Sequence, residues 1–147
     1  MYEFELTNAC LKLLRDMFMM QPGETIAITC DTESSMEIVD ATAQAAVILG
    51  AKPLVVKIAA PRGCGKTADQ DMPCDSLVGA IKNADAWVEY NYEWIFYSDT
   101  YDRIIADPEN RSLYNRAPQS IHRSFPIALP FLYGQRVRWA PSDGGPG

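Results

Sequence analysis

The sequence has few of the side chains that metal and thiol chemistry require. Its 147 residues include one histidine, His122, and four scattered cysteines. Neither a CxxC pair nor an HExxH motif occurs, so the chain shows no recognisable structural or hydrolytic zinc site. Ser34 and Ser35 lie in no GxSxG turn, so the usual signal of a serine hydrolase is missing. From the residues alone we predict no catalytic, cofactor-binding or metal-ligating residue in this chain.

Long hydrophobic runs are also missing. No stretch of about 18 consecutive apolar residues occurs, so we predict no membrane-spanning helix and no membrane partner. The N-terminus is acidic, with Glu3 and Glu5, and no apolar signal segment follows it. These features argue against secretion. We therefore expect a cytoplasmic protein whose four cysteines are free thiols, two of them on core-facing elements.

Positive charge is scarce and unevenly distributed. The formal net charge is −6, and an acidic surface repels phosphate backbones, so nucleic acid is not an expected partner. Residues 1–110 hold eight Lys or Arg against 18 Asp or Glu, whereas residues 111–147 hold five Arg and one Asp. The two parts of the chain therefore differ in composition as well as in charge.

The sequence is rich in alternating helical and strand patterns. Apolar residues make up 48% of the chain, enough for the core of one domain. Helical spacing marks 4–20, 36–50, 75–83 and 97–107, and short β-rich runs mark 25–30, 53–58 and 86–90. This order predicts an α/β fold with a small doubly wound, mainly parallel sheet and helices on both faces. The near-continuous apolar run at 53–58 predicts a strand covered on both faces, and 59–74 is expected to be a long loop.

The alternating pattern ends before the C-terminus. Residues 115–147 hold five prolines, four glycines and no lysine, and no helix or strand period continues there. We divide the chain into an α/β domain, 1–114, and an irregular Pro/Arg-rich tail, 115–147. Three interpretations of the tail stay open: an irregular or disordered extension, a non-native sequence that follows a shift of reading frame, and a folded basic arm that binds a partner.

One segment resembles a phosphate-binding loop. Ala60 to Thr67, reading APRGCGKT, differs from GxxxxGK[ST] at its first glycine. In such a loop the backbone N–H groups and Lys66 bind phosphates, and the hydroxyl group holds magnesium. Two acids and Pro73 soon after the lysine make a poor anion-binding helix start. An ordinary surface loop is the simpler interpretation, and a small nucleotide-binding protein that uses Gly63–Thr67 is an alternative.

Two other groups of residues have more than one interpretation. Asp31, Glu33 and Glu37 follow the first β-rich run, and they either cap the next turn and helix or bind a cation. Seven aromatic residues lie between 87 and 101. They indicate core packing and an association surface at 87–97, with stacking of a ligand ring as the alternative.

Short motifs in a fixed order resemble the thermophilic leucyl-aminopeptidase family. The motifs are Pro22-Gly23-Glu24-Thr25, similar to its PGE opening; Gly50-Ala51-Lys52-Pro53, similar to the approach to its second strand; and ADAWVEYN at 84–91 with WIFYS at 94–98, similar to a segment of one branch. The chain also resembles 2,5-dihydroxypyridine 5,6-dioxygenase, an iron-dependent ring-cleaving enzyme of the same superfamily. The resemblance covers roughly residues 3–114.

The resemblance implies a second, C-terminal domain that carries the metal ligands, and nothing after Tyr114 matches it. We therefore expect a truncated N-terminal domain of a leucyl-aminopeptidase-like metallohydrolase, inactive alone, or else a fragment of a dioxygenase-like iron enzyme. No metal or other cofactor is expected in this chain. A divalent metal such as zinc, cobalt or manganese, and a peptide or small aromatic substrate, are implied only for a full-length relative. A homodimer is the self-assembly that we expect.

Overall fold

The computed structural model describes residues 3–106 and 124–125, and it confirms the predicted α/β class. The helices are α1 (Glu3–Lys12), α2 (Met36–Ile48), α3 (Cys74–Lys82) and α4 (Asp99–Ile105), with a π-helical turn at Leu13–Met17 and a 3-10 helix at Gly65–Asp71. The strands are β1 (Thr25–Asp31), β2 (Lys52–Ile58), β3 (Ala86–Glu89) and the two-residue β4 (Ser124–Phe125). Among the helices of these described residues, none is long and apolar enough to cross a membrane.

The strands form a parallel sheet in the order β2-β1-β3-β4. Thr29 of β1 lies opposite Glu89 of β3 on one side and Val56 of β2 on the other. Because β1, β2 and β3 run the same way, their carboxyl ends meet at one edge of the sheet. β4 adds two residues beside β3, within the region where the sequence predicts an irregular tail. The rest of that tail, including His122, lies outside the described residues.

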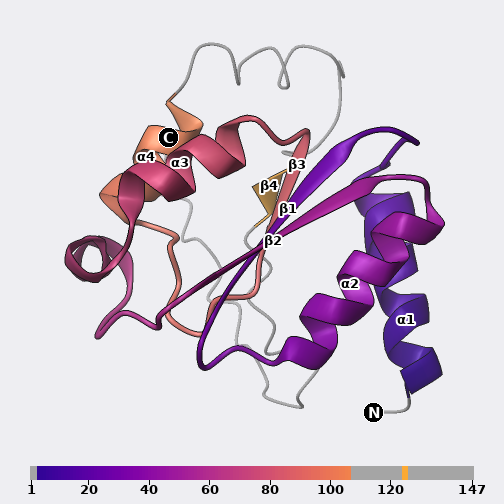
Figure 1. The fold of residues 1–147 in the computed structure, drawn as a ribbon, viewed down its shortest axis with the longest axis horizontal. Coiled ribbons are helices and arrows are strands. Elements are labelled where there is room, and N and C mark those ends of the chain that lie inside the picture. The colour runs from indigo at the N-terminus through magenta and orange to yellow at the C-terminus, as the bar shows by residue number, and fades with distance from the viewer. Residues whose placement is uncertain (1–2, 107–123, 126–147) are drawn as a thin grey trace, which may run out of the picture.

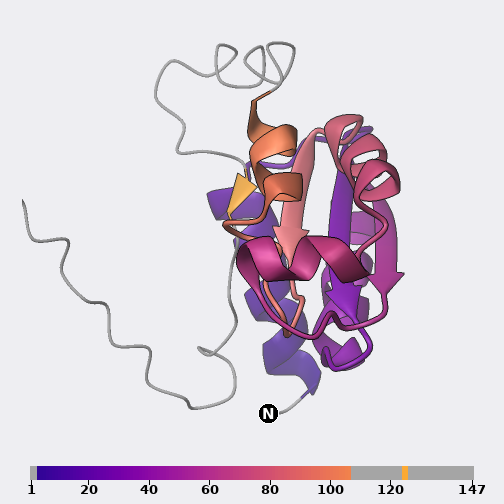
Figure 2. The same ribbon diagram turned by 90° about the vertical axis from the view of Figure 1, so that its left-hand side faces the viewer.

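Helices cover both faces of the sheet, as the alternating pattern predicts (Figure 1). One core lies between the sheet and α1 and α2, and it takes the alternate strand residues Ile26, Ile28 and Val88. The other core lies towards α3 and α4, and it takes the residues between them, Ala27 and Trp87. Figure 2 shows the same layers from the side. Successive strand residues point to opposite faces, so β1 and β3 each supply both cores.

The expectation that β2 is covered on both faces is wrong. Leu54 is 42% exposed and Val55 is 41% exposed, because β2 is an edge strand that pairs with β1 alone among the described strands. An apolar run does not tell a central strand from an edge strand. The charged Lys52 and Lys57, with Pro53 between them, are typical of edge strands, and they were the better signal.

The segment predicted as a long loop after β2 is partly helical. Gly65–Asp71 forms a 3-10 helix whose Ala68 is fully buried against the second core. The first predicted helix also differs in detail, since α1 ends at Lys12 and a π-helical turn at Leu13–Met17 follows it. Gly50, by contrast, ends α2 as expected, with a φ of +77° that suits glycine.

Candidate functional site

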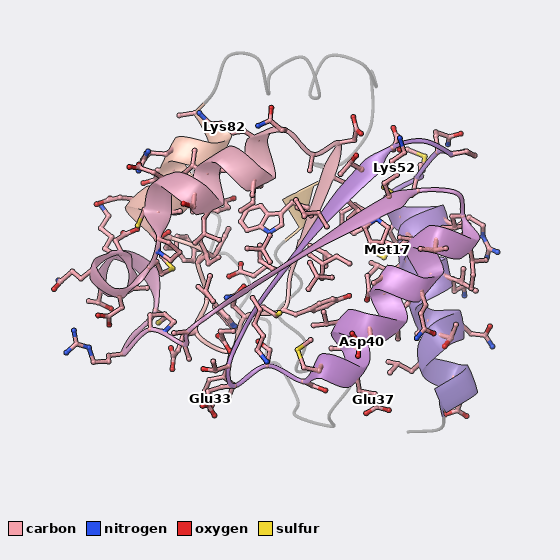
Figure 3. All side chains as sticks on the ribbon, viewed as in Figure 1. Met17, Glu33, Glu37, Asp40, Lys52 and Lys82 are labelled. Atoms are coloured by element: carbon pink, nitrogen blue, oxygen red, sulfur yellow. The ribbon has the colours of Figure 1, made fainter. Side chains whose placement is uncertain are left out.

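Polar residues replace apolar ones where β1 and β3 reach the carboxyl edge of the sheet. Figure 3 labels Glu33 just beyond the end of β1 and Lys52 at the start of β2, which are opposite ends of the sheet. Towards α3 and α4, Ala27 of β1 is followed two residues later by Thr29, and Trp87 of β3 is followed by Glu89. In doubly wound sheets, ligands bind outside the carboxyl ends of the strands.

Three side chains define what we call the polar edge: Asp31, Glu89 and Asn91. All three are buried, with exposed fractions of 0%, 3% and 4%. Asp31 ends β1, Glu89 ends β3, and Asn91 follows two residues later. Asn91 lies outside β3, in the segment that continues the chain beyond the carboxyl end of the strand. The register places Glu89 opposite Thr29, two residues before Asp31, so the three residues lie at the carboxyl ends of two neighbouring strands.

Both carboxylate oxygens of Asp31 are hydrogen-bonded. Its Oδ1 accepts from the N–H of Glu33 and from the hydroxyl of Ser34, both at 2.9 Å. Its Oδ2 accepts from the N–H of Glu93 at 3.0 Å. This carboxylate therefore holds the turn after β1 and the segment after β3 in one arrangement.

Glu89 is only partly hydrogen-bonded. Its Oε1 accepts from the backbone N–H of Ile95, and the N–H of Phe96 also stabilises the charged form. Its Oε2 is buried and has no hydrogen-bond partner among the described residues. Burial raises the pKa of Glu89 to about 7, the two N–H groups oppose that change, and the nearby Asp31 adds to it. A carboxyl of this kind exchanges its proton near neutral pH.

Asn91 has no hydrogen-bond partner on either side-chain atom among the described residues. A buried polar atom that lacks a partner loses about 1–3 kcal/mol of hydration without replacement, and few native groups are left in that condition. With Glu89 Oε2, three unpaired atoms lie at the end of β3 and just beyond it. A polar partner is therefore expected at the polar edge.

The segment 91–97, which we call the covering loop, lies over this edge. Two of its backbone N–H groups, from Glu93 and Ile95, are held by the carboxylates of the sheet. Between them, the carbonyl of Trp94 accepts from the N–H of Gly65 at 3.2 Å. The loop is thus attached to β1, to β3 and to the 3-10 helix through its backbone rather than through its own side chains.

The aromatic residues divide between the interior and the covering loop. Trp87 and Tyr90 are buried in the two cores, and the indole N–H of Trp87 donates to the Thr29 hydroxyl at 3.0 Å. Tyr92, Trp94 and Tyr97 are exposed, at 68%, 43% and 69%. Core packing therefore accounts for the first pair. Association and ring stacking stay predictions for the three exposed rings.

The segment that resembles a phosphate-binding loop uses its polar groups internally. The N–H and guanidinium of Arg62 bind the carboxylate of Asp71, and this pairing lowers the pKa of Asp71 to about 2. The Thr67 hydroxyl donates to the Cys64 carbonyl at 2.8 Å. Lys66 lies 3.3 Å from a carboxylate oxygen of Asp99. This arrangement does not favour a nucleotide site, because phosphates would have to displace each of these partners.

The three acidic residues predicted as caps or cation ligands, Asp31, Glu33 and Glu37, lie in different environments. Asp31 caps the turn that precedes α2, while Glu33 and Glu37 are exposed. In the part of the chain that the structure describes, no group of three or more His, Cys, Asp or Glu side chains is placed to hold a metal ion. The geometry therefore supports the capping interpretation for Asp31.

Sequence reasoning missed Glu89 and Asn91. A signal was present, because β3 and the residues after it alternate Trp87, Glu89 and Asn91 with Val88 and Tyr90. A buried strand that puts an acid and then an amide on one face needs a polar environment at its end. Metal-ligand spacing does not reveal this pattern, because the pattern contains no histidine or cysteine.

Comparison with known proteins gives a structural relative but no family. No protein-family model matches the chain, and no curated protein sequence matches it. Among solved structures, the chain is similar to the 2,5-dihydroxypyridine dioxygenase from Pseudomonas putida KT2440, with a TM-score of 0.62 and 20% identity over 72% of this chain. It also matches a LacI-family transcription regulation repressor from Corynebacterium glutamicum, with a TM-score of 0.44 and 14% identity over 73% of this chain and 38% of the repressor, a likeness too distant to support an argument.

The chain spans 32% of the dioxygenase structure that it matches. At 20% identity the similarity shows a shared fold and no shared chemistry. The resemblance to 2,5-dihydroxypyridine dioxygenase is therefore confirmed as a similarity of fold alone. The resemblance to leucyl aminopeptidases stays a prediction.

Proposed function

We propose that this chain is a domain of an enzyme related to 2,5-dihydroxypyridine dioxygenase, and that the polar edge of its sheet faces the bound ligand. In this role its α/β fold forms one wall of the active-site cleft, and the metal is held elsewhere. The observation that carries the proposal is the structural similarity to that dioxygenase over 72% of this chain. Since the chain spans about a third of that protein, the activity of a whole enzyme is part of the proposal.

The buried polar edge supports this role. Parallel α/β sheets bind ligands at their carboxyl ends, and here that end has buried hydrogen-bonding atoms that the described residues leave unpaired. A structural edge alone would be better filled by apolar side chains. The polar edge is therefore suited to orient a bound molecule.

The described residues do not fit an iron site. An iron(II) centre in oxygenases typically takes two histidines and a carboxylate. The one histidine of the sequence, His122, lies outside the described residues, and those residues contain no cluster of three His, Cys, Asp or Glu side chains. We derive no catalytic step through a metal in this domain.

The test is to supply the purified protein with iron(II) and 2,5-dihydroxypyridine. Metal content and oxygen consumption are measured, and backbone amide shifts are followed by NMR. We expect no stoichiometric iron and no oxygen consumption, with saturable shifts at the Glu93, Ile95 and Phe96 amides. Stoichiometric iron with ring cleavage would show that this chain is itself the catalytic unit. If millimolar 2,5-dihydroxypyridine leaves these amide chemical shifts unchanged, the polar edge does not form part of a binding site for that ligand.

A leucyl-aminopeptidase-like role is a second candidate, favoured only by the sequence motifs. The same protein, supplied with zinc, cobalt or manganese, is assayed for hydrolysis of leucine p-nitroanilide. Binding of this substrate at the covering loop, with no response to 2,5-dihydroxypyridine, would favour the aminopeptidase relation over the dioxygenase relation.

A further inference from the structure

The hydrogen-bonding capacity of the polar edge is specific. Asn91 Nδ2 needs an acceptor, Asn91 Oδ1 needs a donor, and Glu89 Oε2 in its charged form needs a second donor. The remaining oxygens, of Asp31 and Glu89 Oε1, already accept from backbone N–H groups and a hydroxyl. A molecule that fills this edge therefore presents at least one acceptor and at least two donors.

The charge of the edge excludes anions. Asp31 and Glu89 are buried, and neither forms an ion pair with a Lys or Arg of the described residues. On the loop after β2, Arg62 pairs with Asp71 and Lys66 with Asp99. A carboxylate or phosphate ligand would be buried beside two acids that have no ion-pair partner among these residues, which is unfavourable.

We propose that the polar edge is a binding site for a neutral ligand that carries a primary carboxamide. This group has one carbonyl acceptor and two N–H donors in a single plane. Its carbonyl pairs with Asn91 Nδ2, one N–H with Asn91 Oδ1, and the other N–H with Glu89 Oε2. The group is uncharged, so its burial beside two acids avoids the desolvation of a further ion.

Access to the site requires the covering loop to move. The loop is held by the backbone N–H groups of Glu93 and Ile95, and its Trp94 carbonyl is held by Gly65. The N–H of Ile95 bonds the same carboxyl that receives the ligand. Binding is therefore reported by the amides of this loop and by the Trp87 indole N–H, whose acceptor Thr29 lies opposite Glu89.

The experiment is a titration of the full chain, labelled with nitrogen-15, at about pH 8, where Glu89 is ionised. The ligands are benzamide, N,N-dimethylbenzamide, which lacks both N–H donors, and benzoate, which is an anion. Benzamide is expected to shift the Ile95, Phe96 and Trp87 indole signals saturably. The other two ligands are expected to bind at least about tenfold more weakly, because each lost hydrogen bond is worth roughly that factor.

Variants add a second readout. Asn91→Leu is expected to abolish the benzamide shifts, while Asn83→Leu, at an exposed amide that bonds the Gly79 carbonyl, is expected to retain them. If Asn91→Leu does not fold, Asn91→Asp serves, since it removes the donor and adds a charge. Absence of saturable shifts with benzamide, or equal affinity for N,N-dimethylbenzamide, would overturn the proposal.

This inference rests on the proposed function, which places a ligand at the polar edge. The two proposals can be contradicted independently of each other. Shifts with 2,5-dihydroxypyridine but not with benzamide would contradict the carboxamide class alone. Shifts with benzamide but not with 2,5-dihydroxypyridine would contradict the dioxygenase relation and leave the carboxamide site standing.

Discussion

At the residue scale, the unpaired amide of Asn91 makes a prediction about stability. Replacing a buried group that lacks partners by an apolar side chain of similar shape removes a desolvation penalty. We expect Asn91→Leu to raise the free energy of unfolding by about 1–2 kcal/mol in the absence of ligand. Residues of functional sites are often less stabilising than the best alternative at the same position. Chemical denaturation in urea measures the change.

The control for this change is Asn83→Leu. Asn83 Nδ2 donates to the Gly79 carbonyl at 2.7 Å, so its loss is expected to lower stability by about 1 kcal/mol. A loss of stability in Asn91→Leu as large as that in the control would mean that the Asn91 amide already has partners in solution, such as tightly bound water.

Glu89 makes a second prediction at the same scale, on pH dependence. Its pKa is raised by burial from 4.5 to about 7, so the fold favours the protonated form. The resulting stabilisation is complete below about pH 4.5 and is lost as the pH rises through about 7. We expect the difference in unfolding free energy between wild type and Glu89→Gln to change by on the order of 3 kcal/mol across that window. The wild type becomes less stable relative to the variant as the pH rises.

Unfolding free energies of both proteins, measured from about pH 4.5 to about pH 8, provide the test. Glu93→Gln, at a half-buried acid of the same loop, serves as the control and is expected to follow the wild type. A constant difference between wild type and Glu89→Gln would show that the Glu89 carboxyl has the same pKa folded and unfolded.

At the element scale, two glycines predict opposite effects of one substitution. Gly50 closes α2 with a φ of +77°, and a Cβ there would lie 3.2 Å from the Pro22 Cβ. Gly79 lies inside α3, and a Cβ there would meet nothing within 4 Å. We expect Gly50→Ala to lower stability by about 1–2 kcal/mol and Gly79→Ala to raise it by about 0.5–1 kcal/mol. Thermal unfolding of the two variants compares them directly, and a change of the same sign in both would contradict the placement of Gly50 at the end of α2 and of Gly79 inside α3.

Most elements could be predicted from the sequence because their signals are local. The helix-spaced apolar residues of α2 and α3, the β-rich runs and the glycine after α2 each depend on nearby residues alone. The exposure of β2 could not be derived from its apolar run, because exposure depends on which strands flank it. The 3-10 helix at Gly65–Asp71 depends on long-range bonds, such as that from Gly65 to Trp94, which sequence spacing does not reveal.

The candidate site was harder to predict than the fold. Asp31 was visible as a polar residue after a strand, but its bond to the Glu93 amide joins residues 62 positions apart. Glu89 and Asn91 are ordinary polar residues in sequence, and only the register of β3 beside β1 buries them together with Asp31. The sequence resemblance indicated a fold like that of 2,5-dihydroxypyridine dioxygenase, but it identified no site residue.

At the scale of the whole molecule, the sheet order predicts how the protein opens. β1 lies between β2 and β3 and is buried from Ile26 to Asp31, whereas β2 has one unpaired side among the described strands. We expect the β1 amides to exchange with solvent only through global unfolding, and the outward-facing amides of β2 to exchange through local opening. Native-state hydrogen exchange tests this order. Equal protection of β2 would instead indicate that another chain pairs with its edge.

The burial of Glu89 at the carboxyl edge of the sheet underlies both the expected pH dependence and the proposed ligand site. The direct measurement is a titration of the side-chain carboxyl carbons by carbon-13 NMR, with Glu89 assigned through Glu89→Gln. We predict that the Glu89 signal titrates with a midpoint near 7, as burial beneath the covering loop requires. A midpoint near the ordinary value of 4.5 would show that water reaches this carboxyl, and that the unpaired atoms of the edge are solvated rather than reserved for a ligand.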